Sequence, residues 1–435
     1  MTLSGIAERV RFIINRLREQ LWVMPLVVGL LSIGTALIAR AADGTRLDQI
    51  MPEIAADSVN SLLSVMASSM LVIATFAVGS MVSAYAFASS NASPRSLPLV
   101  IADDSSQRAL SAFIGAFIFS IVGLIALNNG YFGTAGRFVL FLFTIIVFGI
   151  VVFTFVRWVD SIARLGRLAN TIDKVEIATA AALKRRRKAP ALHGLPAATV
   201  SASTTGEPVF AKTIGYVQRI DVASLQSCAE ALDGRIRVAV LPGKFVMPQI
   251  AVAYIDSASN TGEDLDHQEI IEAFKIGKER RFDDDPRYGL TVLSQIAGRA
   301  LSPGINDPGT AIDVIGMLVR LFVIWSSPDD EHDSSDVKYD RVVVPELSTR
   351  EMFDDAFTAI ARDGSNSVEV VMRLHKALSS LASTGDSSMR EAATDHAQQA
   401  VAYAEKALVL PEHLAMVREM ADFAHNPHEE DGEDP

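Results

Sequence analysis

The side chains best suited to chemistry gather between residues 280 and 310. Carboxylates, amides and arginines occur there in two phrases, RRFDDDPRYG starting at Arg280 and RALSPGINDPGT starting at Arg299. Mg²⁺ and Ca²⁺ prefer oxygen ligands, and an anion prefers the open N–H groups at the start of a helix, here the helix expected from Pro308. The phrases therefore allow a cation site or an anion site. The candidate metal ligands are Asp283, Asp284, Asp285 and Asp307.

The same phrases also have a purely structural interpretation. Asp285 reads as a helix N-cap followed by proline at the first helical position, and Asp307 repeats this arrangement. Because capping is the commonest use of such residues, we favour a tight corner between two helices and keep the ligand site as the alternative. The corner comprises Pro303 and Gly304, which stop the earlier helix, and Asn306, Asp307 and Pro308.

The familiar catalytic motifs do not occur in this sequence. It contains no G-x-x-x-x-G-K-[ST] phosphate loop, no G-x-S-x-G elbow and no H-E-x-x-H pair. The single cysteine, Cys228, excludes an intrachain disulfide and a metal site built from several cysteines. The eight histidines are scattered. We therefore predict no cofactor and no catalytic residues, and an enzyme at the 280–310 corner is the weakest functional hypothesis.

A second pattern lies in the charge-free stretch from Ser58 to Pro94. Residues at three- and four-residue steps share one face of a helix, and all of them here except Val72 are small or hydroxylated. Such a face serves close helix packing, its commoner use, or lines a water-filled path in an oligomer. Both interpretations remain open. We name this set the stripe, and it comprises Ser61, Ser64, Ser68, Thr75, Gly79, Ser83, Ala86 and Ser90.

Four stretches are long enough to cross a membrane, because a helix needs about 20 apolar residues to span about 30 Å of hydrocarbon. None of the four contains an ionisable side chain, which argues against a proton-driven pump. The predicted spans are Leu21–Ala39, Leu62–Ala88, the apolar part of Ala109–Ala135, and Phe138–Val156.

Basic residues are concentrated before the first span and after the fourth, whereas the first and third connections are poor in them. Because cytoplasmic loops carry the excess of lysine and arginine, we expect a multi-pass protein of the bacterial inner membrane with both termini in the cytoplasm. The run Lys184–Lys188 would act as a topological signal of this kind or would contact anionic lipid headgroups.

The composition changes after the spans. Residues 1–190 hold 18 basic and 11 acidic side chains, whereas residues 191–435 hold 21 and 40, which argues against a nucleic-acid binder. The expected fold class is a mainly α membrane protein, in which a four-helix transmembrane region precedes a cytoplasmic α+β region. The expected parts are a transmembrane domain at 1–158, a basic helical stalk at 159–190, a linker at 191–207, a small β-rich module at 208–260, a helical bundle at 261–425 and an acidic disordered tail at 426–435.

Within the cytoplasmic region, the pattern predicts a short helix from Val222 with Asp221 as its N-cap. One further strand is expected at Arg341–Val344. The helices predicted for the bundle are His267–Lys278, Arg287–Leu301, Pro308–Trp325, Thr349–Ala361, Val368–Leu381, Ser388–Val409 and Pro411–His425.

Three groups of phrases resemble a family of bacterial inner-membrane proteins catalogued as a domain of unknown function. They are SLLSVMASSMLVIATFAVGSMVSAYAFASSNASPR from Ser61, GYVQRID from Gly215 with PGKFV from Pro242, and DDDPRYGLTVLSQIAGRALSPGINDPGTA from Asp283. The resemblance implies four spans and a cytoplasmic domain. It implies no activity and supplies no catalytic residue.

Our leading functional hypothesis is a homo-oligomeric, channel-like protein whose cytoplasmic domain regulates a path lined by the second span. Its expected partners are membrane lipid, further copies of the chain, and an ion or small-molecule ligand. The alternative is a membrane-tethered scaffold, or a ligand or cation sensor, without transport.

Overall fold

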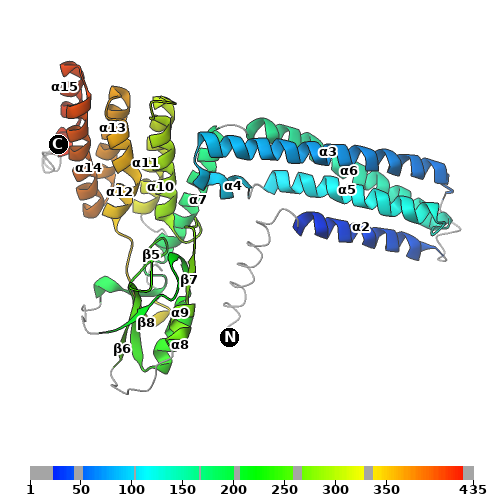
Figure 1. Cartoon of the computed structure of the whole chain (residues 1–435), viewed down its shortest axis with the longest axis horizontal. Coiled ribbons are helices and arrows are strands. Elements are labelled where there is room, and N and C mark those ends of the chain that lie inside the picture. Colours follow the sequence, from blue (N-terminus) through cyan, green and yellow to red (C-terminus); the bar gives the residue numbers. More distant parts are fainter. Residues whose placement is uncertain are drawn as a thin grey trace, which may run out of the picture. The chain divides into compact units, whose positions relative to one another are not determined.

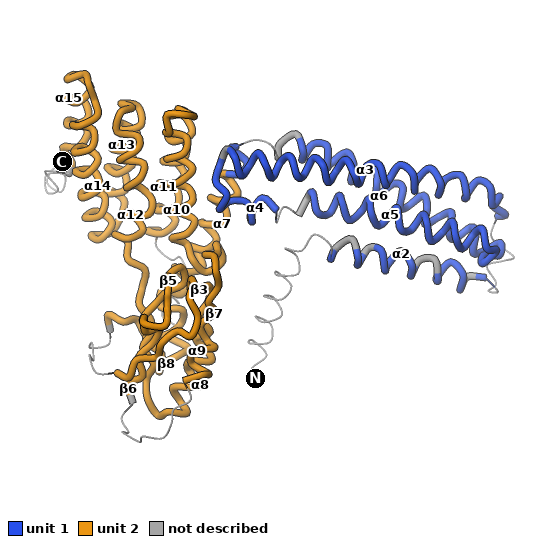
Figure 2. Tube along the Cα trace, in the orientation of Figure 1, with its two compact units in different colours: residues 1–171 blue, residues 172–435 orange. Residues whose placement is uncertain are grey.

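The computed structural model describes residues 23–43, 52–101, 104–165, 168–199, 206–257, 267–327 and 337–424. The chain divides into two compact units, Met1–Thr171 and Ile172–Pro435 (Figure 2). The boundary falls inside helix α7, Leu168–Lys188. The predicted acidic tail lies outside the described residues.

Unit 1 is a set of long helices that run side by side (Figure 1). The first, α2, packs against α5 and α6, and α3 packs against the same two helices. Its helices are α2 (Val23–Ala42), α3 (Ala56–Asn91), α4 (Leu97–Ile101), α5 (Asp104–Asn128) and α6 (Thr134–Leu165), and a 3-10 turn, η2 (Pro94–Ser96), precedes α4. The fold class predicted from the sequence is confirmed for this region.

Each predicted span corresponds to one of these helices, and α2 contains the described part of the first span. Among the described residues, the helices long and apolar enough to cross a membrane are Ala56–Ser90, Ser106–Asn128, Thr134–Ile162 and Pro308–Ser326. The first three match the second, third and fourth predicted spans. The last belongs to unit 2 and was expected as a helix of the cytoplasmic bundle.

Large side chains between the helices hold unit 1 together. Trp158 of α6 is 2% exposed and lies edge-on to Phe113 of α5, with ring centroids 5.8 Å apart. Near one end of the helices, the Asp43 carboxylate accepts hydrogen bonds from the N–H groups of Gly133 (2.8 Å) and Gly136 (2.6 Å). Asp43 therefore satisfies open donors at the start of α6 and links that end to α2.

The strands among the described residues of unit 2 form one sheet of five strands and one of three. The larger has the strand order β1-β8-β4-β6-β2, and the smaller has the order β5-β3-β7. The strands are β1 (Gly194–Pro196), β2 (Glu207–Phe210), β3 (Gly215–Ile220), β4 (Gly234–Val238), β5 (Phe245–Val246), β6 (Ala251–Ser257), β7 (Phe274–Gly277) and β8 (Tyr339–Val344). A 3-10 turn, η3 (Ala197–Thr199), follows β1. Strand β8 confirms the strand expected at Arg341–Val344.

The helices of unit 2 include two short ones beside the sheets and a bundle. Phe322, Phe353 and Phe357 pack together at the centre of the bundle, with centroid distances of 4.4 to 5.6 Å. The helices are α8 (Val222–Ala231), α9 (Gln268–Glu272), α10 (Pro286–Ala300), α11 (Pro308–Ser326), α12 (Thr349–Asp363), α13 (Val368–Thr384), α14 (Ser387–Ala407) and α15 (Pro411–Met420), and a 3-10 turn, η4 (Asp422–Ala424), ends the described chain.

Two sequence expectations differ from this fold. The predicted helix His267–Lys278 is wrong, because it divides into α9 and strand β7, which pairs with β3. The stretch expected as a linker, 191–207, contains β1 and the first residue of β2, and β1 pairs in parallel with β8. The β structure therefore extends beyond residues 208–260, because β7 and β8 pair with β3 and β4 of that range and β1 pairs with β8.

Helix α11 owes its apolar composition to its position in the bundle. One face is fully buried, through residues such as Val314, Leu318 and Leu321, and the helix packs against α10 and α13. Its opposite side carries exposed Asp313 and Arg320. An amphipathic core helix is expected to have this composition without crossing a membrane.

Candidate functional site

The two faces of α3 differ in chemistry and in burial. Met66, Met70, Ala74, Ala77 and Met81 are buried against the other helices of unit 1. The stripe faces the other way, and every one of its residues is exposed. Among the described residues, α3 therefore packs through its methionine face, and the stripe is not used for packing against the other described helices of unit 1.

The hydroxyl groups of the stripe donate hydrogen bonds to their own helix. Ser68 donates to the carbonyl of Ser64 (3.0 Å), Thr75 to that of Leu71 (2.9 Å) and Ser83 to that of Gly79 (3.0 Å). Such back-bonding satisfies the donor and leaves an oxygen lone pair facing outward. The stripe therefore tolerates an apolar neighbour and still offers acceptors to water or an ion.

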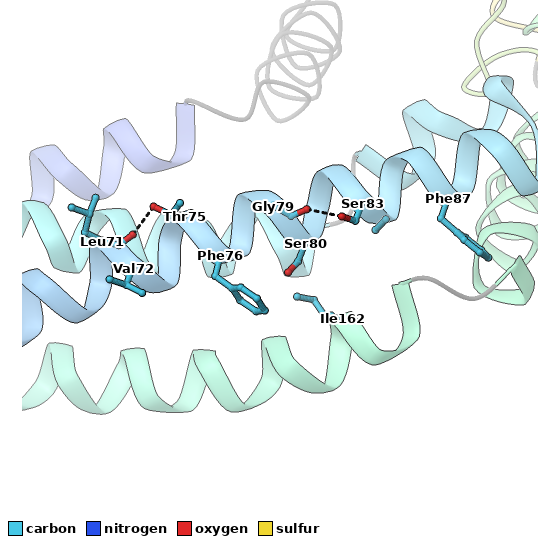
Figure 3. Close-up of a pocket in the computed structure, with 10 residues that line it drawn as sticks. Leu71, Val72, Thr75, Phe76, Gly79, Ser80, Ser83, Phe87 and Ile162 are labelled. Carbon is cyan, nitrogen blue, oxygen red and sulfur yellow. Dashed lines mark hydrogen bonds between the residues drawn. The ribbon is translucent and has the colours of Figure 1, made fainter.

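The middle of the stripe forms the floor of an open groove of about 1050 Å³ (Figure 3). The floor is formed by the small residues Gly79, Ser80 and Ser83, and the larger side chains of Phe76 and Phe87 line the same groove. Ile162 of α6 contributes to the same groove. The remaining lining residues are Leu71, Val72, Thr75 and Ala84.

The four candidate metal ligands do not form a metal site. Asp285 accepts from the Arg280 guanidinium (2.7 and 3.0 Å) and from the N–H of Tyr288 (3.1 Å). Asp307 accepts from the N–H (3.2 Å) and the hydroxyl (2.6 Å) of Thr310. Across the described ranges, no three histidine, cysteine, aspartate or glutamate side chains are grouped so that they could hold a metal ion.

Both helix N-caps predicted for the corner are present in the structure. Asp285 is the N-cap of α10 and Asp307 is the N-cap of α11, each followed by proline in the first turn. Between them, Asn306 adopts a positive φ of 50°, and the N–H of Asp307 donates to the carbonyl of Ala300 (2.8 Å). Pro303 and Gly304 lie in the turn that separates the two helices. Capping explains why these residue types occur together here.

Sequence reasoning missed the role of the basic run at the end of α7. Arg185 donates to the backbone carbonyl of Asp283, and Arg187 donates to that of Ile324 (2.5 Å). Arg186 is 4% exposed. These arginines therefore also make contacts within unit 2, which the sequence analysis did not anticipate.

Arg186 differs from the other arginines of this basic run in its hydrogen bonding. All three nitrogens of its guanidinium are buried, and none makes a hydrogen bond to a residue that the structure describes. Burial lowers its pKa to about 10, although Asp284, Asp285 and Glu346 favour its charged form. Burial also raises the pKa of Asp284, mostly because the carboxylate loses water.

A sequence signal for the burial of Arg186 does exist. The buried residues of α7 in unit 2 recur at helical spacing, as Ile172, Val175, Thr179 and Ala182. The next step of four residues reaches Arg186. Extending this buried face of the stalk by one turn therefore places Arg186 on it.

Several of the sequence phrases noted above come together beside Asp285. Gly243, in the PGKFV phrase, has a φ of +94°, and a Cβ at this position would overlap the Asp285 carboxylate. The N–H of Gly243 donates to the carbonyl of Val217 in GYVQRID (2.8 Å). Gln218 of that phrase donates to the carbonyl of Glu279 (2.8 Å). The turn, strand β3 and the loop before α10 thus form one contiguous region.

Residues 18–380 match the family described as "Predicted membrane protein (DUF2254)". The chain belongs to this family. Uncharacterized proteins of Mycobacterium bovis and Mycobacterium tuberculosis are 26% identical to it over 347 residues. The match covers 76% of this chain and 66% of the length of each relative. No solved structure matches the chain. The chain is thus a membrane protein whose relatives carry no stated activity.

Proposed function

We propose that this membrane protein assembles from identical copies whose α3 stripes face one another around a path for ions or small polar solutes. The observation that carries the proposal is that the whole stripe is exposed, whereas the methionine face of the same helix is buried against the other helices of unit 1. Small residues permit close approach of backbones, and the outward lone pairs offer acceptors along a path. In this proposal the chain has no catalytic activity.

The spans would lie in the bacterial inner membrane with both termini in the cytoplasm. The arginines before α2 and the basic residues after α6 support this orientation, because such residues accumulate on the cytoplasmic side. Unit 2 would then regulate the path from inside the cell.

Cross-linking tests the arrangement of the α3 helices. Cys228 is the only cysteine of the chain, so a Cys228→Ala background gives a cysteine-free protein. In native membranes we expect Ser83→Cys to form a disulfide-linked dimer on mild oxidation. Phe153→Cys, on an α6 side chain that is 63% exposed, serves as the control and should remain monomeric. Cross-linking at position 153 without cross-linking at position 83 would refute the arrangement.

Conduction separates a path from simple packing. A leucine at position 83 adds bulk to the groove floor, so Ser83→Leu should lower ion flux in liposomes while the size of the detergent-solubilised oligomer is unchanged. Val156→Leu, on an exposed side chain of α6, should change neither property. If Ser83→Leu failed to assemble and the unchanged protein showed no ion flux, the stripe would be a surface for helix packing and would not line a path.

A further inference from the structure

Arg186 lies in the interior of unit 2, where the residues that the structure describes give its guanidinium no hydrogen-bond acceptor. The group carries five N–H donors, and a buried charge is normally paired or hydrogen-bonded. None of its nitrogens has a hydrogen-bond partner in the described chain. The side chain nevertheless lies on the regular buried face of α7, so its burial follows from the fold of the helix.

The neighbouring groups do not supply what Arg186 lacks. Asp285 is hydrogen-bonded to Arg280 through both carboxylate oxygens. Glu346 is exposed, so water screens its charge. Asp284 is half-buried and does not hydrogen-bond Arg186; burial raises its pKa, although Arg219, Arg185 and Arg186 act in the opposite direction.

We propose that Arg186 binds an oxyanion, the carboxylate or phosphate group of a small molecule, within unit 2. The planar fork of a guanidinium matches two oxygens of either group, and this pairing is strongest where water is excluded. The ligand would join the end of α7 to the loop that contains Asp284. This inference is independent of whether the chain forms a path through the membrane.

Thermal unfolding of the purified full-length chain tests the site. At constant ionic strength, phosphate or acetate replaces chloride over a range of concentrations. A ligand that binds only the folded state raises the unfolding midpoint by mass action, so we expect a saturable rise with one or both anions. The anion with the lower half-saturation concentration identifies the ligand class.

Two variants make the test specific. Arg186→Lys keeps a positive charge but loses the fork, and we expect its half-saturation concentration to rise about tenfold. Lys184→Gln removes an exposed charge from the same run and should bind as the unchanged chain does. An equal rise in Arg186→Lys, or no saturable rise in the unchanged chain, overturns the proposal. If Arg186→Lys fails to fold, the anion titration of the unchanged chain and Lys184→Gln still decides.

Discussion

Asp285 and Asp307 each begin a helix, yet their pKa values shift in opposite directions. Asp285 is 3% exposed, and the loss of water raises its pKa although Arg280 and the N–H of Tyr288 favour its charge. Asp307 is half-buried, and its two hydrogen bonds from Thr310 lower its pKa. Although both residues cap a helix, folding therefore favours the charged form of Asp307 and disfavours the charged form of Asp285.

Replacing Asp307 should weaken the start of α11. Asp307→Ala leaves the N–H and hydroxyl of Thr310 without their acceptor, and we expect a loss of about 1 kcal/mol in stability. Hydrogen exchange of the peptide covering Pro308–Val314 should accelerate accordingly. Asp283→Ala, which removes an exposed carboxylate just before α10, is the control and should leave this exchange unchanged.

The pH dependence of this contribution has a definite sign. The pKa of Asp307 is lower in the folded protein, so its contribution is present above about pH 4, its ordinary value, and is lost as the pH falls through the folded value. The difference in stability between the unchanged chain and Asp307→Ala should therefore shrink at the acid end. A constant difference across that range would contradict the capping account.

At the scale of elements, the contact between α7 and α10 depends on a glycine. A Cβ at Gly289 would overlap the side chain of Thr179, which is fully buried. Gly289→Ala should therefore separate the two helices and destabilise unit 2 by about 1–3 kcal/mol, an overpacking cost that exceeds the gain in helix propensity. Thermal unfolding of the full-length chain measures the change.

The matched control is Gly316→Ala in α11. Gly316 also lies inside a helix, but the nearest atom to an added Cβ there is an Arg373 nitrogen at 3.9 Å. The substitution should be neutral or stabilise the helix by up to about 1 kcal/mol. If both glycine variants had the same effect, close packing of α7 on α10 would not be the reason.

The local sequence pattern predicted the features that depend only on residues close together in the chain. The capped starts of α8, α10 and α11 were predicted because each cap acts within one helical turn. Strand β7 was not, since the pattern Phe274–Gly277 follows a helical signal and becomes a strand only by pairing with β3. Strand β1 has only three residues and needs the distant β8 to form.

Only part of the candidate site could be predicted from the sequence. The composition of the stripe was evident from spacing alone, whereas its exposure depends on which face of α3 contacts α5 and α6. Arg186 falls on a regular helical period, but its lack of hydrogen-bond acceptors among the described residues depends on tertiary contacts such as the pairing of Asp285 with Arg280. Such properties arise from tertiary contacts, which no local pattern contains.

For the whole molecule, the orientation in the membrane is the property on which the regulatory role of unit 2 depends. Reporter fusions at the C-terminus test it directly. We expect a fluorescent protein to be bright and alkaline phosphatase to be inactive there, because unit 2 is predicted in the cytoplasm. The reverse pair of results would place unit 2 outside the cell and remove its proposed access to cytoplasmic ligands.

Helix α3 has 36 residues, so its axis is about 54 Å long. The hydrocarbon of a bilayer is about 30 Å thick, and even a tilt of 40° would leave α3 covering about 41 Å along the membrane normal. One or both ends of the helix must therefore project into the headgroup layer or beyond. In a ring of such helices, the projecting turns would form a vestibule, and a solute would meet serine side chains before it entered the lipid-enclosed part of its route.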